Sequence, residues 1–133
     1  MKIVYCFALM IGLSCFLPAD NCAQSGGLTK IADYQGAEYF RTAQGSFPVF
    51  KLQGSWLEMG RQFGYLANDL LCSFHDEIMA DIQARGKTPA EIQEEAEFNY
   101  NLYPPYFQQL YQGTAETCDL TFDEVIALNA SFF

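Results

Sequence analysis

The stretch LQGSWLEMGRQFGYL constrains the fold more than any other, because it places two glycines inside a predicted helix. Ser55-x-x-Glu58 is a capping box, in which each side chain satisfies a free backbone N–H, so it marks the helix start. Glycine inside a helix costs about 0.5–1 kcal/mol relative to alanine. Gly60 and Gly64 lie on one side of this helix and predict close contact with a neighbouring sheet or helix. Gly54 predicts a tight turn from a strand into the helix.

The helix is predicted to continue to about Gln83, because apolar residues recur at steps of three or four. These residues share one face: Met59, Phe63, Leu66, Leu70, Phe74, Ile78 and Ile82. Gly86 is predicted near the C-terminal cap. Residues 46–53 form the predicted strand, with Phe47, Val49 and Leu52 as its apolar positions. Pro48 places this strand at a sheet edge or delays its start.

Three further helices are predicted towards the C-terminus. Thr88-Pro89-Ala90-Glu91 combines a cap, a proline at the first helical position and a glutamate at the third. That helix should end before Pro104-Pro105, and a helix over about residues 105–115 should follow, with Phe107, Leu110 and Tyr111 facing inwards. Thr121-x-x-Glu124 is a capping box that opens the last helix. Residues 24–41 are turn-rich and are predicted to hold at most a short strand or helix. The expected class is α+β, mostly helical with one or two strands.

Residues 1–23 have the outline of a secretory signal peptide, with a basic start, an apolar middle and small residues near a cleavage site. We place cleavage between Ala23 and Gln24 and expect an exported, periplasmic or extracellular protein. The apolar run is shorter than the roughly 20 residues of a spanning helix, so no stable membrane span is expected. Lipid attachment at Cys15 or Cys22 is the weaker alternative, because neither cysteine has the usual lead-in.

The net charge is −9, which disfavours binding to nucleic acid because the chain would repel phosphates. Two cysteines, Cys72 and Cys118, remain after the leader, and either a bridge or a free pair is compatible with the sequence. The aromatic content gives the chain more apolar surface than a short domain readily buries. A partner that covers some of this surface is therefore expected.

No constellation of residues in the chain predicts an active site. Cys72 and His75 are one helical turn apart, but nothing completes a catalytic pair or a metal site, so a buried cysteine and a half-exposed histidine are expected. Asp76 and Glu77 add only a weak cation site. The acidic run from residue 91 to residue 97 is the solvated face of a helix. We therefore predict no catalytic residue, no metal and no cofactor in this chain.

Two segments nevertheless resemble a known family. LQGSWLEMGRQFGYLANDLL and YPPYFQQLYQGTAETCDLTFDEVIALNA resemble, in order and spacing, the opening part of the peptidase C45 family. These are acyl-CoA:6-aminopenicillanic acid acyltransferases and related amidases among the N-terminal-nucleophile hydrolases. The second segment carries the pattern in these residues: Gly113, Ala115, Glu116, Leu120, Thr121, Glu124, Val125, Ala127, Leu128 and Asn129. Thr117-Cys118-Asp119 departs from the family's glycine-rich turn.

The resemblance implies an αββα sandwich, of which residues 24–133 would be the N-terminal segment, incomplete at its C-terminus. The nucleophilic cysteine would lie beyond this chain, on a C-terminal segment of the same precursor that would be its partner. The substrate would be a small-molecule amide or a thioester. Tyr103, Tyr106 and Phe107 are candidates to line its pocket, although core packing is the more common role of such residues. The apolar end at Ser131-Phe132-Phe133 indicates a cut chain.

Two functions of different classes follow from these observations. The first is the N-terminal portion of an exported cysteine amidohydrolase or acyltransferase, inactive by itself. The alternative is a small exported helical protein without enzymatic activity, which binds a partner through its aromatic face. A remnant of a truncated gene differs from the first reading only in whether the remainder exists.

Overall fold

The computed structural model describes residues 27–42, 45 and 47–128 of the 133-residue chain. It divides the chain into two compact units, residues 1–53 and residues 54–133. The predicted leader and the apolar end at Ser131-Phe132-Phe133 lie outside the described residues. No helix in the described ranges is long and apolar enough to cross a bilayer.

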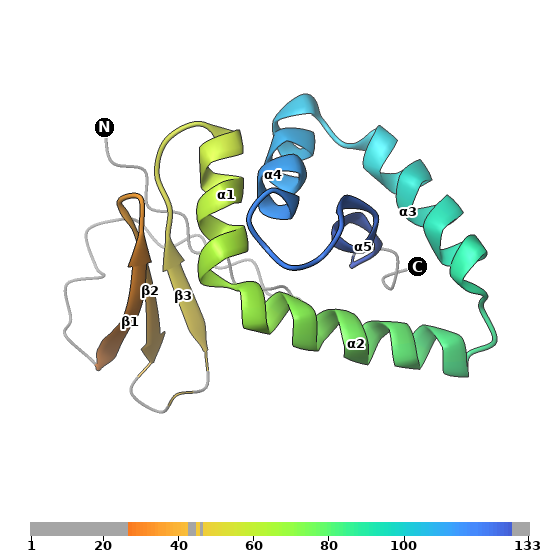
Figure 1. Ribbon diagram of the computed structural model, residues 1–133, viewed down its shortest axis with the longest axis horizontal. Coiled ribbons are helices and arrows are strands. Elements are labelled where there is room, and N and C mark those ends of the chain that lie inside the picture. Colours follow the sequence, from red (N-terminus) through yellow and green to blue (C-terminus); the bar gives the residue numbers. More distant parts are fainter. Residues whose placement is uncertain (1–26, 43–44, 46, 129–133) are drawn as a thin grey trace. The chain divides into compact units, whose positions relative to one another are not determined.

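The first unit is a three-stranded antiparallel sheet (Figure 1). Its strands are β1 (Leu28–Tyr34), β2 (Ala37–Thr42) and β3 (Pro48–Lys51), in the order β1-β2-β3. The prediction of one or two strands is therefore wrong. The turn-rich lead-in is a hairpin whose two turn residues, Gln35 and Gly36, both have positive φ, at 48° and 83°. This is the backbone that a two-residue hairpin turn requires, and glutamine is an unusual residue for it.

The strand predicted around Pro48 is confirmed, but of its three predicted apolar positions only Leu52 is buried, at 1% exposure. Pro48 is the first residue of β3, and β3 pairs only with β2, so the proline stands at a sheet edge where its missing N–H is tolerated. Phe47 is 68% exposed, whereas Phe50 is only 2% exposed and stacks on Tyr39 of β2 with ring centroids 4.7 Å apart. The pairing with β2 decides which face is buried, and sequence alternation alone does not contain this information.

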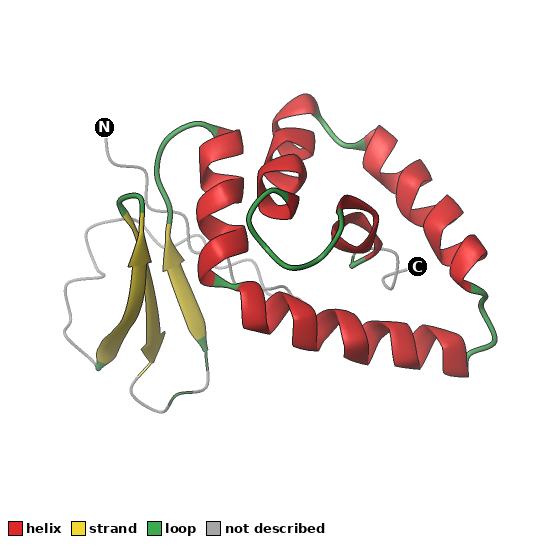
Figure 2. Cartoon of the chain, in the orientation of Figure 1, coloured by secondary structure: helices red, strands yellow, loops and turns green. Residues whose placement is uncertain are grey.

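The second unit is helical, and its five helices are drawn in red in Figure 2. They are α1 (Trp56–Leu66), α2 (Asn68–Ala84), α3 (Pro89–Leu102), α4 (Pro105–Ala115) and α5 (Phe122–Ala127). All predicted helix starts are confirmed, as is the end before the two prolines. α5 packs on both α3 and α4 and buries Val125 and Ile126 (Figure 1).

The single long helix predicted from Ser55 to about Gln83 is wrong, because the chain changes direction at Ala67. This residue has φ −105° and ψ 9°, and α1 and α2 meet there at an angle (Figure 1). The next residue, Asn68, donates through its side-chain amide to the Asp119 carboxylate at 2.7 Å. α1 packs against α4, and Asn68 at the start of α2 binds the link after α4. The bend lies between these two contacts. Both contacts join residues that are far apart in the sequence. A prediction from hydrophobic periodicity alone therefore runs the helix straight through the bend.

The glycines of α1 are explained by the contact between α1 and α4. A Cβ placed on Gly60 would lie 2.3 Å from the Leu110 carbonyl oxygen and 3.0 Å from the Cα of Gly113. From the other side, a Cβ on Gly113 would lie 2.2 Å from the Leu57 carbonyl oxygen. The helix backbones therefore touch where both side chains are absent. The predicted close approach is confirmed, and the neighbour is a helix of the same chain rather than a sheet.

Three capping boxes hold the starts of α1, α3 and α5, and each uses a glutamate: Glu58, Glu91 and Glu124. In each box the N-cap residue donates to the carboxylate through its backbone N–H and its hydroxyl, at 2.7–2.8 Å. These hydrogen bonds lower the pKa of all three carboxyl groups, the backbone bond being the larger cause. They favour the ionised form in the folded chain only.

We expect the free energy of unfolding of the helical unit to fall as the pH is lowered. A carboxyl group whose pKa is lowered by folding stabilises the protein above the unfolded value of about 4.3, and this stabilisation is lost as the pH falls through the folded pKa. Urea titrations at neutral pH and at several acidic pH values measure the dependence. The triple variant Glu58→Gln, Glu91→Gln, Glu124→Gln should show a shallower fall. An unchanged slope in this variant would contradict the assignment.

Candidate functional site

The three residues predicted to line a pocket are brought together by the junction between α3 and α4. Tyr103 caps the end of α3, and Tyr106 and Phe107 lie in the first turn of α4, after Pro104. The ring of Phe107 lies 5.0 Å from that of Tyr106 and 6.2 Å from that of Tyr103, measured between centroids. The two prolines make this cluster possible because they end one helix and start the next within a few residues.

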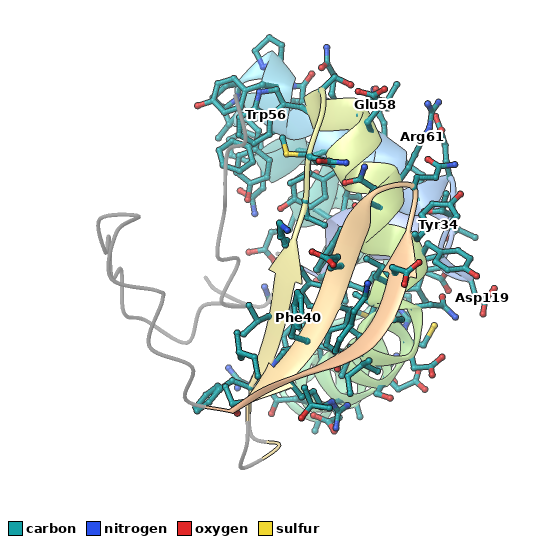
Figure 3. The ribbon with its side chains drawn as sticks, turned by 90° about the vertical axis from the view of Figure 1, so that its left-hand side faces the viewer. Tyr34, Phe40, Trp56, Glu58, Arg61 and Asp119 are labelled. Atoms are coloured by element: carbon teal, nitrogen blue, oxygen red, sulfur yellow. The ribbon has the colours of Figure 1, made fainter. Side chains whose placement is uncertain are left out.

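Trp56 belongs to the same cluster, although the sequence analysis did not include it. Its ring centroid is 5.0 Å from that of Tyr106 and 6.0 Å from that of Phe107. Figure 3 shows Trp56 on the opposite side of α1 from Glu58 and Arg61. The signal was present, since Trp56 directly follows the cap at Ser55, but the contact joins residues about 50 positions apart and sequence periodicity does not report it.

The cluster continues into a row of aromatic rings that reaches α5. Tyr103 stacks on Tyr111 with centroids 5.6 Å apart and planes 3° apart. Tyr100 meets both Tyr111 and Phe122 edge-on, at 6.2 Å and 5.2 Å. We call the following set the aromatic row: Trp56, Tyr106, Phe107, Tyr103, Tyr111, Tyr100 and Phe122. It connects the start of α1, the junction of α3 with α4, and the start of α5.

Two glutamine side chains on α4 support this row. The Gln108 amide donates to the backbone carbonyl oxygens of Tyr100 and Tyr103, at 3.2 Å and 3.1 Å. The Gln112 amide donates to the hydroxyl of Tyr100 at 3.2 Å. Carbonyl groups in the last turn of a helix have no partner within the helix, so the Gln108 bonds satisfy the end of α3. The rings are therefore held by polar bonds as well as by contact with each other.

The spacing of the rings indicates packing before it indicates binding. Centroid distances of 5.0–6.2 Å are those of aromatic side chains in direct contact, so little room for a ligand is left between the rings of the row. Tyr106 is 42% exposed, while Tyr103 and Phe107 are half-buried. That the three residues line a substrate pocket stays a prediction.

Cys72 and His75 do not form a catalytic pair. Both are half-buried on α2, and the nearest polar contact of the Cys72 thiol is the Asn68 side-chain oxygen at 3.9 Å. The His75 imidazole lies 3.4 Å from the Asp76 carboxylate. Burial raises the pKa of the Cys72 thiol, and the negative charge of Asp119 raises it further. A reactive cysteine has the opposite shift, so this thiol is not activated.

The acidic residues form no metal site in the described part of the chain. Among residues 27–42, 45 and 47–128, no group of three or more histidine, cysteine, aspartate or glutamate side chains is placed to hold an ion. In the acidic run, Glu91 belongs to a capping box, Glu95 pairs with Lys87 and Glu97 accepts from Gln93. These three glutamates therefore cap the helix or bind neighbouring side chains on its surface.

The most extensive polar contacts lie between α1 and the link that follows α4. Arg61 pairs with Glu116, and the Thr117 hydroxyl donates to the Arg61 carbonyl oxygen at 2.7 Å. The Thr114 hydroxyl of α4 donates to the Gly60 carbonyl oxygen of α1 at 3.4 Å. Figure 3 shows Arg61 and Asp119 on the same side of the helical unit. Together with the glycine contact, these bonds fix α4 and its following link against α1.

Comparison with known proteins adds no relative. No family model, no curated protein and no solved structure matches this chain.

Proposed function

We propose that this chain is the N-terminal part of an exported cysteine amidohydrolase or acyltransferase of the N-terminal-nucleophile type, as its resemblance to the peptidase C45 family implies. One observation carries the proposal: the two segments that resemble the family lie against each other at the residues that define the resemblance. Gly60 of the first segment touches Gly113 of the second, backbone to backbone.

Other residues of the two segments support the same pairing. Arg61 of the first segment pairs with Glu116 of the second, and Asn68 binds Asp119. Thr121 and Glu124 form the capping box that starts α5, which buries Val125. The residues of the pattern thus have structural roles: they join α1 to α4 and set the start of α5. Thr117 and Asp119, which depart from the family's glycine-rich turn, contribute hydrogen bonds to this junction.

The chemistry would belong to a cysteine outside this chain. In such enzymes the thiolate attacks the carbonyl carbon of an amide or thioester, the leaving group departs, and water or an amine resolves the acyl-enzyme. Hydrogen-bond donors stabilise the tetrahedral intermediate. Burial raises the pKa of both Cys72 and Cys118, which disfavours their thiolates, so neither takes the role of nucleophile.

The role of the helical unit would be to pack against the remainder of an αββα sandwich. Among the described residues of this unit, four large hydrophobic side chains are more than a third exposed: Tyr65, Phe98, Leu102 and Tyr106. Phe98 and Leu102, at 64% and 68%, are one turn apart on α3 and share a face. Exposed apolar residues that are grouped in this way mark surfaces covered by another part of a protein. The cysteine-bearing segment would cover them.

The test is to read the coding sequence beyond Phe133 and to produce the longer polypeptide. We expect an in-frame continuation with a cysteine shortly after the last helix, and self-cleavage of the product immediately before that cysteine. Cysteine-to-alanine substitution there should abolish both cleavage and amide hydrolysis. A stop codon directly after Phe133 would overturn the proposal and favour a small binding protein.

The 133-residue chain alone is expected to have no amidase activity. Release of amine from penicillins, bile-acid amides and N-acyl amino acids should stay at the rate of buffer, because neither Cys72 nor Cys118, the two cysteines in the described residues, is activated. Cys72→Ser and Cys118→Ser serve as controls. Turnover by the chain that either substitution removed would show that the nucleophile lies inside it.

A further inference from the structure

The two cysteines of the helical unit are far apart in sequence, but one side chain, that of Asn68, contacts both the Cys72 thiol and the residue after Cys118. Cys72 lies in the second turn of α2, and Cys118 lies in the link between α4 and α5. Both are free thiols and both are half-buried. Neither has a part in the proposed function. Their common neighbourhood therefore requires a separate explanation.

The side chain of Asn68 connects the two positions. Its oxygen accepts from the backbone N–H of Asp119, the residue after Cys118, at 2.8 Å. The Cys72 thiol lies 3.9 Å from the same oxygen. The Asn68 amide also donates to the Asp119 carboxylate at 2.7 Å. One amide thus holds the Cys72 thiol on one side and the chain next to Cys118 on the other.

The backbone around Cys118 is fixed by further bonds. The N–H of Cys118 donates to the Thr114 carbonyl oxygen at 3.1 Å, and the Cys118 thiol lies 3.7 Å from the Leu120 carbonyl oxygen. The Thr117 hydroxyl binds the Arg61 carbonyl oxygen of α1. The link is therefore held to its own helix and to α1, and it cannot carry Cys118 away from α2 without breaking several bonds.

We propose that Cys72 and Cys118 form an intrachain disulfide under oxidising conditions, which fastens α2 to the link between α4 and α5. With oxidised glutathione as the oxidant, one thiolate attacks a glutathione sulfur and releases one reduced glutathione. The other thiolate then attacks the mixed disulfide and releases the second. The two protons lost by the protein thiols are taken up by the two glutathione thiolates that leave, one S–S bond forms in the protein, and the two electrons reduce the glutathione disulfide.

The charge around the thiols determines the pH at which this reaction runs. Burial raises the pKa of both thiols, and Asp119, the Cys118 thiol and Asp76 raise that of Cys72 further. Since the attacking species is the thiolate, oxidation is slow at neutral pH and accelerates as the pH rises. The bond, once formed, is structural rather than catalytic.

The experiment oxidises the full chain in glutathione redox buffers and maps the cysteines by trypsin digestion without reduction. Cys72 falls in the fragment from Gln62 to Arg85, Cys118 in the fragment that starts at Thr88, and the three leader cysteines share the fragment that starts at Ile3. A bond between Cys72 and Cys118, between Cys72 and the leader, and between Cys118 and the leader therefore gives three different masses. We expect the fragments of Cys72 and Cys118 to be linked to each other.

The same buffers measure how strongly the fold favours the bond. The effective concentration of one thiol towards the other should be about tenfold or more higher in the native chain than in urea, because a flexible chain provides only millimolar values. An equal or lower value in the native chain, or linkage mainly to the leader fragment, would overturn the proposal. Asn68→Ala should lower the native value several-fold, while Ser73→Ala, on the same helix, should leave it unchanged.

Discussion

Gly60→Ala is expected to destabilise the helical unit by about 2 kcal/mol, although alanine is the better helix former. Propensity alone would stabilise α1 by about 1 kcal/mol. The added Cβ, however, would lie 2.3 Å from the Leu110 carbonyl oxygen, and the neighbouring atoms of Gly113 are also backbone. A backbone cannot rotate away as a side chain does, so α1 and α4 must separate. Overpacking of this kind costs about 1–3 kcal/mol, and lost contacts along the interface add to it.

Urea unfolding followed by circular dichroism measures this effect. Gly113→Ala places a Cβ 2.2 Å from the Leu57 carbonyl oxygen and tests the same contact from α4, so a similar loss is expected. Gln109→Ala is the matched control, because Gln109 is exposed on α4 and its substitution should change stability by less than about 0.5 kcal/mol. A Gly60→Ala variant more stable than the parent would show that the helices do not touch at this point.

Helix starts could be predicted from the sequence because their causes are local. Ser55, Thr88 and Thr121 each bind a glutamate three residues later, so a window of four residues contains all the necessary information. The bend at Ala67 depends instead on Asn68 binding Asp119, about 50 residues away. Likewise, the hairpin at Gln35 places a non-glycine residue at positive φ, and no common turn signature marks it.

In the candidate site, too, the local contacts could be predicted from the sequence and the long-range contacts could not. Tyr103, Tyr106 and Phe107 are neighbours in sequence around two prolines, so their clustering could be predicted. Trp56 joins them only because α1 packs along α4, and the glycine contact that causes this packing could be predicted without its partner being known. The same limit applies to Phe50, which is buried by its stacking on Tyr39 of the neighbouring strand.

Phe107→Ala should separate the two explanations of the aromatic row. The Phe107 ring contacts three other rings of the row, those of Trp56, Tyr106 and Tyr103. If the row is packing, its removal should cost about 2 kcal/mol, below the 3–5 kcal/mol of a fully buried phenylalanine because this one is half-buried. Trp56 is the single tryptophan, so its fluorescence should shift to longer wavelength in the same variant.

Tyr106→Phe is the control for this experiment, because it keeps the ring and removes only an exposed hydroxyl. It should leave both stability and Trp56 fluorescence nearly unchanged. A Phe107→Ala variant that keeps its full free energy of unfolding and its emission maximum would mean that the ring supports no neighbour. Phe107 would then be free to serve a ligand, and the pocket prediction would be favoured over packing. Loss of stability would instead leave Tyr106 as the part of the row available for binding, because it is the member of the row with the greatest exposure, at 42%.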